Sequence, residues 1–205
     1  MSRSQPERQT GRPARAGVGP QRRSESGKPR ARWLEELLDW AKTLGVALVI
    51  VLLVNRFVFN LSTVEGQSME PTLVQDEWLL VNKIGYLIGE PERYDVVILK
   101  DPSEQIDRKE YLVKRIIGLP GDTVEIRAGG LYVNGVQTVE SYTDVEIEDT
   151  DYGPEKIAEG FYFVMGDNRR AGASKDSRSF KPVPRALIKG KAQFVLWPIA
   201  KINKL

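Results

Sequence analysis

The stretch "EYLVKRIIGLPGDTVEIR", residues 110–127, decides what kind of fold this chain adopts. It holds two runs rich in Val and Ile, residues 110–118 and 122–127, and Pro120-Gly121 separates them. Short runs of β-branched residues interrupted by Pro-Gly are typical of strands joined by a turn. The stretch therefore predicts a β-sheet protein.

The rest of the chain after residue 60 follows the same pattern. Further apolar runs at residues 77–84, 94–101, 161–167 and 191–198 are expected strands. Gly129-Gly130 and Asn134-Gly135 flank the short run "LYV" and predict two tight hairpins. No long helical period interrupts these runs, so we expect a mainly β fold, with an antiparallel β domain over residues 60–205. An acidic segment is expected to be a solvated excursion: Glu140, Asp144, Glu146, Glu148, Asp149, Asp151, Glu155 and Glu159.

An apolar segment precedes this domain. Residues 44–54 read "LGVALVIVLLV" without a polar side chain, and apolar residues upstream recur at helical spacing. A cleavable signal peptide and a buried core helix are the alternatives. No small-x-small cleavage site follows the segment, and it is apolar all round rather than on one stripe. We therefore expect residues 33–59 to form an amphipathic lead-in and one transmembrane helix.

Positive charge is concentrated in residues 1–32, although the net charge of the whole chain is only +2. Their basic residues are Arg3, Arg8, Arg12, Arg15, Arg22, Arg23, Lys28, Arg30 and Arg32. Basic arms can bind nucleic acid, but no aromatic side chain is interleaved here for base stacking. We expect a disordered tail and no nucleic-acid partner. Because positive residues mark the cytoplasmic side of a span, we expect the tail in the cytoplasm and the β domain outside.

The candidate nucleophile is Ser68, in "VEGQSMEPTL" (residues 64–73). The chain contains no His and no Cys, so neither a thiol nor an imidazole base is available. A serine between Gly66 and Pro71 could equally be a turn residue. If Ser68 is a nucleophile, another kind of side chain must accept its proton.

Lys114 is the candidate base. In a strand it shares a face with Leu112 and Ile116, while Val113 points the other way. If that face is buried, desolvation lowers the pKa of the lysine toward neutrality and makes it a general base. Most strand lysines carry their charge to solvent, so the pattern alone leaves both interpretations open.

A polar loop, "MGDNRRAGASKDSRSFKPVP" (residues 165–184), is the third candidate region. Its carboxylates could indicate a metal site. Without histidine and with arginines interleaved, internal ion pairs are the better interpretation. For Asp167 and Asn168 we favour hydrogen bonds that cap the loop.

Taken together, "GQSMEPTL", "YDVVILKDP", "YLVKRIIGLPGDTVEI" and "GDNRRAGASKDSRSF" resemble, in order, the sequence boxes of bacterial type I signal peptidases in their Gram-positive form. The resemblance covers most of the chain from the anchor onward. It implies a Ser–Lys dyad with Ser68 as nucleophile, Lys114 as general base and the Ser68 N–H as an oxyanion donor. Ser174 then orients the lysine. Asp176 and Arg178 match the supporting ion-pair positions of the last box, where Asp167 and Arg169 also fall, and Arg115 is a further supporting residue.

The chain departs from the family pattern at three places. Gly66 stands where some members have a serine that donates a second hydrogen bond to the oxyanion. The residues "RRAGA" make the separation of Asn168 and Ser174 longer than is common. Lys181 stands where a glycine usually follows the aromatic residue.

The resemblance implies a membrane-bound serine endopeptidase that removes signal peptides from exported preproteins after small residues in an Ala-x-Ala-like site. Its partners would be preprotein signal peptides and membrane lipid, with no metal and no cofactor. Apolar residues expected to line the substrate pockets are Met69, Ile84 and Val113. Two alternatives remain: a self-cleaving Ser–Lys repressor on the same fold, which would lack an anchor, and a membrane-anchored β domain that binds a partner without catalysis.

Overall fold

The computed structural model describes residues 29–103 and 110–205. Most of the predicted N-terminal tail, residues 1–28, lies outside the described residues. The chain divides into two units, residues 1–45 and 46–205, and each is considered by itself. The second unit contains all of the β structure.

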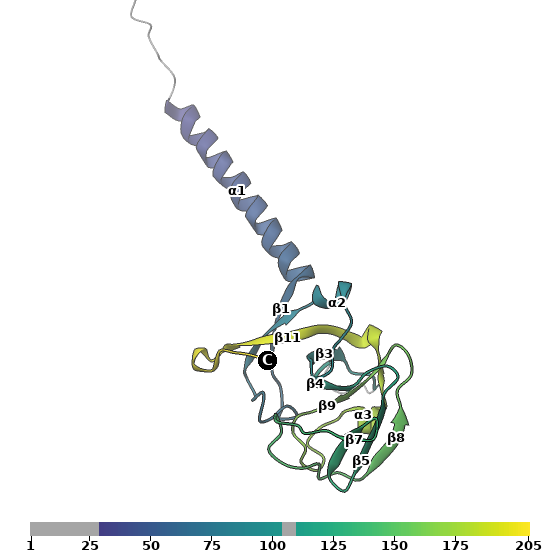
Figure 1. Ribbon diagram of the computed structural model, residues 1–205. Coiled ribbons are helices and arrows are strands. Elements are labelled where there is room, and N and C mark those ends of the chain that lie inside the picture. The colour runs from purple at the N-terminus through teal and green to yellow at the C-terminus, as the bar shows by residue number, and fades with distance from the viewer. Residues whose placement is uncertain (1–28, 104–109) are drawn as a thin grey trace, which may run out of the picture. The chain divides into compact units, whose positions relative to one another are not determined.

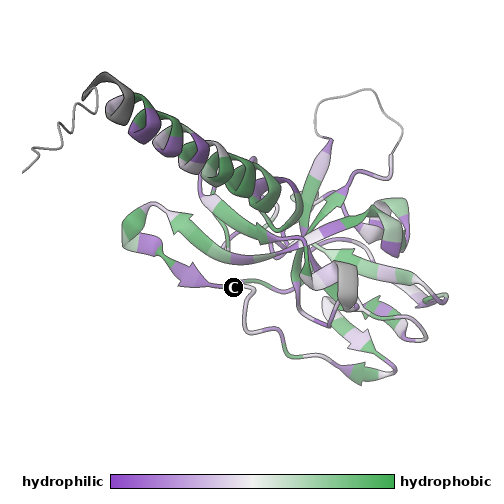
Figure 2. Ribbon diagram, turned by 90° about the horizontal axis from the view of Figure 1, so that it is seen from above, coloured by the Kyte–Doolittle hydropathy of each residue, from purple (hydrophilic) through white to green (hydrophobic). Residues whose placement is uncertain are grey.

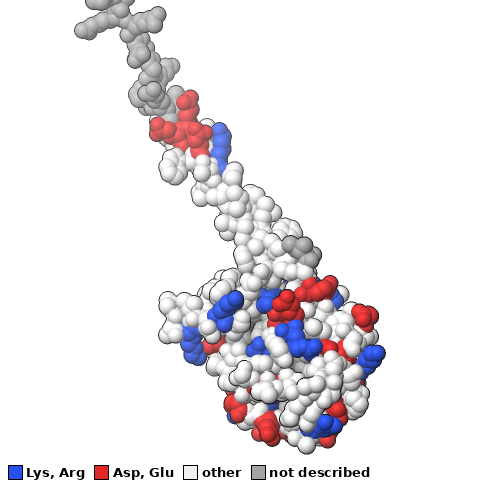
Figure 3. Space-filling model, in the orientation of Figure 1, with Lys and Arg blue, Asp and Glu red and all other residues white. Residues whose placement is uncertain are grey.

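Helix α1 (Pro29–Phe57) contains the apolar segment. Between Trp33 and Phe57 it is apolar enough to cross a membrane, with a mean hydropathy of 2.1 over 18 consecutive residues, and none of these residues is buried against protein. Its 25 residues span about 37 Å at 1.5 Å per residue, enough for a hydrocarbon core of about 30 Å. The charged side chains of α1 gather toward its N-terminal end, and the apolar stretch follows (Figures 2 and 3). A soluble core helix would be buried, so this exposure favours a membrane-spanning helix.

The larger sheet has the order β1-β2-β11-β3-β4-β9-β10, with β12 paired to β11 (Figure 1). Every pairing is antiparallel, which confirms the predicted fold class. The strands are β1 (Phe59–Thr63), β2 (Trp78–Asn82), β3 (Val96–Lys100), β4 (Tyr111–Gly118), β9 (Phe161–Met165), β10 (Val183–Pro184), β11 (Ile188–Trp197) and β12 (Asn203–Lys204). Because β1 begins at Phe59, the sheet starts directly after α1 ends.

The smaller sheet has the order β7-β6-β5-β8. Its strands are β5 (Thr123–Arg127), β6 (Gly130–Val133), β7 (Val136–Gln137) and β8 (Tyr152–Lys156). Both predicted hairpins are present, and Gly129, Asn134 and Gly135 have the positive φ angles that such turns require (75°, 53° and 77°). Strand β8 was not predicted, because "YGPEK" lacks the apolar alternation of a strand and pairs with β5 only at the sheet edge.

Only short helices follow α1 in the described residues: α2 (Gly85–Ile88), α3 (Ser177–Phe180) and the 3-10 turns η1 (Arg185–Leu187) and η2 (Ile199–Lys201). Their brevity agrees with the absence of a helical period in the sequence.

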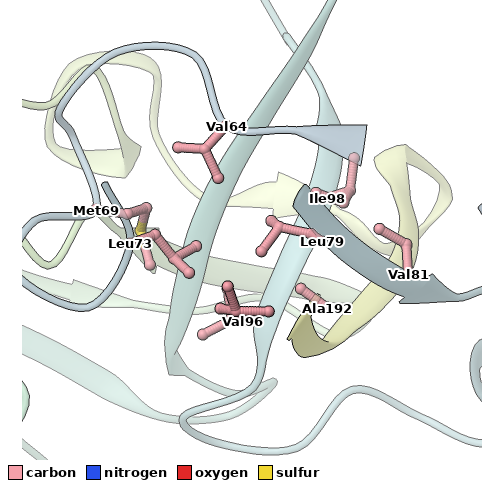
Figure 4. Packing of buried hydrophobic residues seen from close by; sticks show 9 residues of the cluster. Val64, Met69, Leu73, Leu79, Val81, Val96, Ile98 and Ala192 are labelled. Atoms are coloured by element: carbon pink, nitrogen blue, oxygen red, sulfur yellow. The ribbon is translucent and has the colours of Figure 1, made fainter. Parts of the chain in front are cut away.

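One apolar cluster fixes the segment that carries Ser68. Val64, Met69 and Leu73 are at most 3% exposed and pack with buried residues of β2, β3 and β11 (Figure 4). Residues on both sides of Ser68 are therefore held in the core of the larger sheet. The serine itself is left half-buried between them.

Candidate active site

Ser68 lies in a tight turn between β1 and β2. Gly66 has a φ of +87°, which strongly favours glycine, so the chain carries no side chain where some relatives have a serine. The turn closes with a hydrogen bond from Glu70 N to Gln67 O (3.1 Å), and Leu73 N donates to Met69 O (2.9 Å). Ser68 therefore belongs to a turn, as one interpretation held, and the turn presents its side chain.

Lys114, on β4, reaches this side chain. Its Nζ lies 2.7 Å from Ser68 Oγ and also donates to Val113 O at 3.0 Å. Lys114 is only 2% exposed. The predicted apolar strand face is confirmed, because Leu112 and Ile116 pack in one cluster with Val97, the residue opposite Lys114 on β3. Burial of an amine in such surroundings disfavours its charged form.

Asn168 fixes the backbone of the Ser68 turn. Its N–H donates to Ser68 O (3.1 Å), and its side-chain Nδ2 donates to Gln67 O (3.0 Å). The sequence indicated a loop-capping role for Asn168, and the hydrogen bonds exist. One caps its own loop, because Arg170 N donates to Asn168 Oδ1 (3.3 Å), whereas the two given above cap the turn of Ser68, which lies far away in the chain. The loop after β9 is therefore part of the scaffold of the serine.

Gly166 brings Ser174 next to that turn. A Cβ atom at Gly166 would lie 2.3 Å from both Ser68 O and Ser174 Oγ, which is too close for any side chain. The absence of a side chain at residue 166 therefore lets both serines pack against its backbone. Ser174 Oγ is buried and has no hydrogen-bond partner among the described residues. A buried hydroxyl of this kind is available to orient a neighbouring polar group.

Asp176 organises the backbone around Ser174. It is fully buried, caps α3, and its Oδ2 accepts a hydrogen bond from Gly166 N (3.1 Å). Both carboxylate oxygens also accept from the Arg178 guanidinium, at 2.8 and 2.7 Å. Burial alone would raise the pKa of Asp176, but the hydrogen bonds and charge of Arg178 outweigh it and lower that pKa. The predicted pair is thus an ionised one within the site's framework.

A second ion pair connects β4 to the same loop. Arg115 donates to both oxygens of Asp167, from Nε at 2.9 Å and from Nη2 at 2.6 Å. Asp167 also accepts from Thr72 Oγ1, just after the Ser68 turn. Arg115 directly follows Lys114 on β4. Through Asp167, it therefore connects the strand that carries Lys114 both to the loop after β9 and to Thr72, just after the Ser68 turn.

The third buried pair was missed by the sequence analysis. Arg169 is fully buried, its Nε donates to Gly166 O (2.8 Å), and its guanidinium contacts both oxygens of Glu140 at 2.7 and 2.6 Å. Glu140 belongs to the acidic segment that we expected to be solvated. That expectation is wrong for Glu140, whose side chain is 7% exposed, because a buried guanidinium needs a counter-charge.

The acidic segment also holds the extra residues of the "RRAGA" stretch. Arg170 pairs with Asp144 (2.8 Å), Ala171 N donates to Glu148 Oε2 (3.1 Å), and the backbone of Glu148 in turn donates to Arg169 O (3.0 Å). A tight turn from Ala173 N to Arg170 O (3.1 Å) then leads into Ser174. The longer loop therefore still delivers Ser174 to the site.

Lys181, where the sequence resemblance implied a glycine, has a φ of +72°. A lysine in this region of backbone conformation is uncommon. The position thus keeps the glycine-like geometry despite the substitution.

A groove of about 740 Å³ opens beside Ser68 and Lys114. Its lining includes Met69 and Val113, both predicted to contact substrate, together with Leu61, Val64, Ile98 and Leu112. Ile84 is not among the lining residues and lies at the N-cap of α2. The apolar lining comes from β1, β3 and β4, and strand pairing brings these segments together in a way that sequence spacing does not reveal.

The described residues contain no cluster of three or more side chains suited to a metal ion. The carboxylates of the polar loop instead pair with arginines, as the interleaved charges indicated.

A serine hydroxyl within hydrogen-bond distance of a buried amine, at the edge of a groove, is the arrangement that a serine nucleophile and its general base require. The family model described as "Signal peptidase, peptidase S26" matches residues 37–197. The chain is 39% identical over 178 residues to "Signal peptidase I" of Bacillus licheniformis, covering 82% of this chain and 92% of the relative. It is 39% identical over 181 residues to "Signal peptidase I S" of Bacillus subtilis (strain 168), with 83% and 94% covered. The chain belongs to the signal peptidase family, peptidase S26.

The close contact at Gly166 generates a first prediction. The substitution Gly166→Ala forces the Ser68 backbone and Ser174 apart, so kcat for cleavage of a preprotein should fall by at least about 100-fold. The matched control is Gly85→Ala, whose new Cβ would meet Asn82 Nδ2 at an ordinary 3.6 Å. Circular dichroism should show both variants folded. Near-normal activity of folded Gly166→Ala would contradict the argument.

The Arg169–Glu140 pair generates a second prediction. Glu140→Gln leaves a buried guanidinium without its counter-charge, which should cost roughly 3 kcal/mol of unfolding free energy and lower the unfolding temperature by roughly 6–12 °C. Thermal unfolding of the full chain in detergent measures this. Asp144→Asn removes the same charge from the exposed pair with Arg170 and should change the unfolding temperature little. Equal effects of the two substitutions would show that the Arg169–Glu140 pair has no special structural role.

Proposed function

We propose that Ser68 and Lys114 perform the membrane-bound cleavage of signal peptides that is the activity of this family. The observation that carries the proposal is the 2.7 Å contact between Nζ of the buried Lys114 and Ser68 Oγ. The chain has no histidine that could act as the base for a serine, and no cysteine that could act as the nucleophile instead.

The reaction follows from the positions of these atoms. Neutral Lys114 Nζ removes the hydroxyl proton as Ser68 Oγ bonds to the scissile carbonyl carbon. The tetrahedral intermediate then expels the amine, which takes the proton from the lysine, and an ester to Ser68 remains. Lys114 next removes a proton from water, the hydroxide attacks the ester, and the proton returns to Ser68 as the acid product leaves.

The Ser68 N–H is the proposed donor to the oxyanion. Within the described part of the chain this N–H has no acceptor, so it is available to the negative oxygen. Loss of one donor of this kind costs about 100- to 1,000-fold in rate in other enzymes. Gly66 has no side chain that could supply a second donor, which therefore has to come from another group.

Ser174 is proposed to orient the lysine, with Asp176–Arg178 and Arg115–Asp167 as supporting ion pairs. Support comes from the contact of Gly166 with Ser174 Oγ and with the Ser68 turn. The two ion pairs hold the loop that contains Gly166 against β4 and α3.

The preprotein is proposed to bind in the groove as an extended chain. Among the described strands, residues 111–113 of β4 pair with β3, and β9 joins β4 from Arg115 onward, so no described strand pairs with the other edge of this segment. An extended peptide can add to such an edge through backbone hydrogen bonds. The apolar side chains of Met69 and Val113 then favour small apolar residues at the cleavage site, in agreement with an Ala-x-Ala-like preference.

The membrane helix α1 is proposed to have its N-terminus in the cytoplasm and the β domain outside. The concentration of Arg and Lys before Trp33 supports this orientation. Partners are then preproteins and membrane lipid, without nucleic acid, and the chemistry needs no metal or other cofactor. The anchor keeps enzyme and preprotein in the same membrane, which raises their local concentration.

A non-catalytic β domain that binds a partner is the competing function. In such a protein Ser68 would be a turn residue only, and Lys114 would have no reason to be buried against it. The test below separates the two.

The dyad predicts the behaviour of three variants of the full chain in detergent. Ser68→Ala and Lys114→Ala should each reduce preprotein cleavage by at least about 1,000-fold. Lys114→Arg keeps the cation but cannot become a neutral base, so it should be equally inactive. Cleavage by any of these folded variants at the normal rate excludes the dyad, and a wild-type chain that cleaves nothing favours the binding domain.

The lysine base also predicts a pH profile. Only neutral Lys114 accepts the proton, so log(kcat/KM) should rise with pH on the acidic side of the lysine pKa and level off above it. Initial rates of preprotein cleavage across a buffered pH series measure the profile. A rate independent of pH would argue against a lysine base.

A further inference from the structure

A second pocket, of about 540 Å³, lies where α1 ends. It is lined by Leu52, Leu53, Asn55, Arg56, Phe57, Asn60 and Lys83, and it shares no residue with the groove beside Ser68. We propose that this pocket binds the phosphate of one anionic phospholipid. The proposal does not depend on the assignment of Ser68 and Lys114.

Two cations from different elements meet in this pocket. Arg56 is in the last turn of α1, and Lys83 directly follows β2. The backbone places Lys83 beside the helix end, because its N–H donates to Val58 O (2.9 Å) and Phe59 pairs with Asn82. Two segments separated in sequence therefore present positive charge to one space.

Neither cation is neutralised by the protein. Across residues 29–103 and 110–205, no carboxylate forms an ion pair with Arg56 or Lys83, and no Asp or Glu lines the pocket. Within the described residues, the Arg56 guanidinium lies over the Phe57 ring, 5.6 Å from its centroid. A cation in the last turn of a helix is favoured by the helix dipole, which would account for Arg56. It does not account for Lys83, which belongs to no helix.

The remaining lining matches the other parts of a phospholipid. Asn55 and Asn60 supply amide N–H groups that can donate to phosphate oxygens. Leu52, Leu53 and Phe57 supply apolar surface of the kind that contacts an acyl chain. Because the apolar run of α1 ends at Val54, the pocket lies at the level where a membrane-spanning helix meets lipid head groups.

The charge of the pocket selects among phospholipids. A phosphatidylglycerol head group brings one net negative charge to two cations. A phosphatidylcholine head group also brings a quaternary ammonium, which the same two cations repel. Basic pockets beside membrane helices bind anionic head groups on this principle.

The experiment uses the full chain in a nonionic detergent and counts bound lipid by native mass spectrometry during titration with phosphatidylglycerol. The test variant is Arg56→Gln/Lys83→Gln. The matched control, Arg127→Gln/Lys156→Gln, removes two cations from the smaller sheet. Both keep the arginines of residues 1–32, so lipid held by those residues is the same in each. Preprotein cleavage in the same detergent should be normal in both and shows that they are folded.

We expect the test variant to bind its tightest phosphatidylglycerol about 10- to 30-fold more weakly, and the control to match the unsubstituted chain. Equal affinity of the test variant and the unsubstituted chain overturns the proposal. Equally tight binding of phosphatidylcholine overturns the preference for an anionic lipid. Displacement of the lipid by an equal concentration of inorganic phosphate identifies a free-phosphate site instead.

Discussion

The close approach of the loop after β9 to the Ser68 turn is the constraint on which the site depends. Gly166 fits between Ser68 O and Ser174 Oγ only because it lacks a side chain, and Asn168 adjoins it with hydrogen bonds to Ser68 O and Gln67 O. Two loops from distant parts of the chain thus form one rigid unit around the serine. Lys114 then completes the unit from β4.

Buried guanidinium–carboxylate pairs hold this unit in place. Asp167, Arg169 and Asp176 lie within one loop, and each is paired with a residue of opposite charge. Isolated buried charges would be strongly unfavourable, whereas bidentate pairs satisfy both charge and hydrogen bonds. Such pairs also demand accurate geometry, so they define the position of the loop more strictly than apolar packing would. The exposed Arg170–Asp144 pair has no comparable role.

Attachment to the membrane depends on apolar surface rather than on buried ion pairs. The side chains of α1 at residues 44–54 are exposed and apolar, so lipid rather than protein is their natural solvent. The proposed phospholipid pocket lies at the end of this helix, where charged side chains can contact lipid head groups instead of acyl chains. Its cations have no carboxylate partner in the described residues, in contrast to the paired arginines around Ser68.

The sequence by itself determined the fold class, the membrane helix and the candidate dyad. Alternation along β4 indicated an apolar face around Lys114 but left its role open, and the resemblance of four sequence boxes to type I signal peptidases implied the dyad; both rest on local stretches of the chain. Only the tertiary structure decided that Lys114 reaches Ser68, that Glu140 is the buried partner of Arg169, that β8 joins the smaller sheet, and that Ile84 lies outside the groove lining. These facts depend on which segments pair in space, and neither hydrophobic period nor sequence spacing encodes contacts across such distances along the chain.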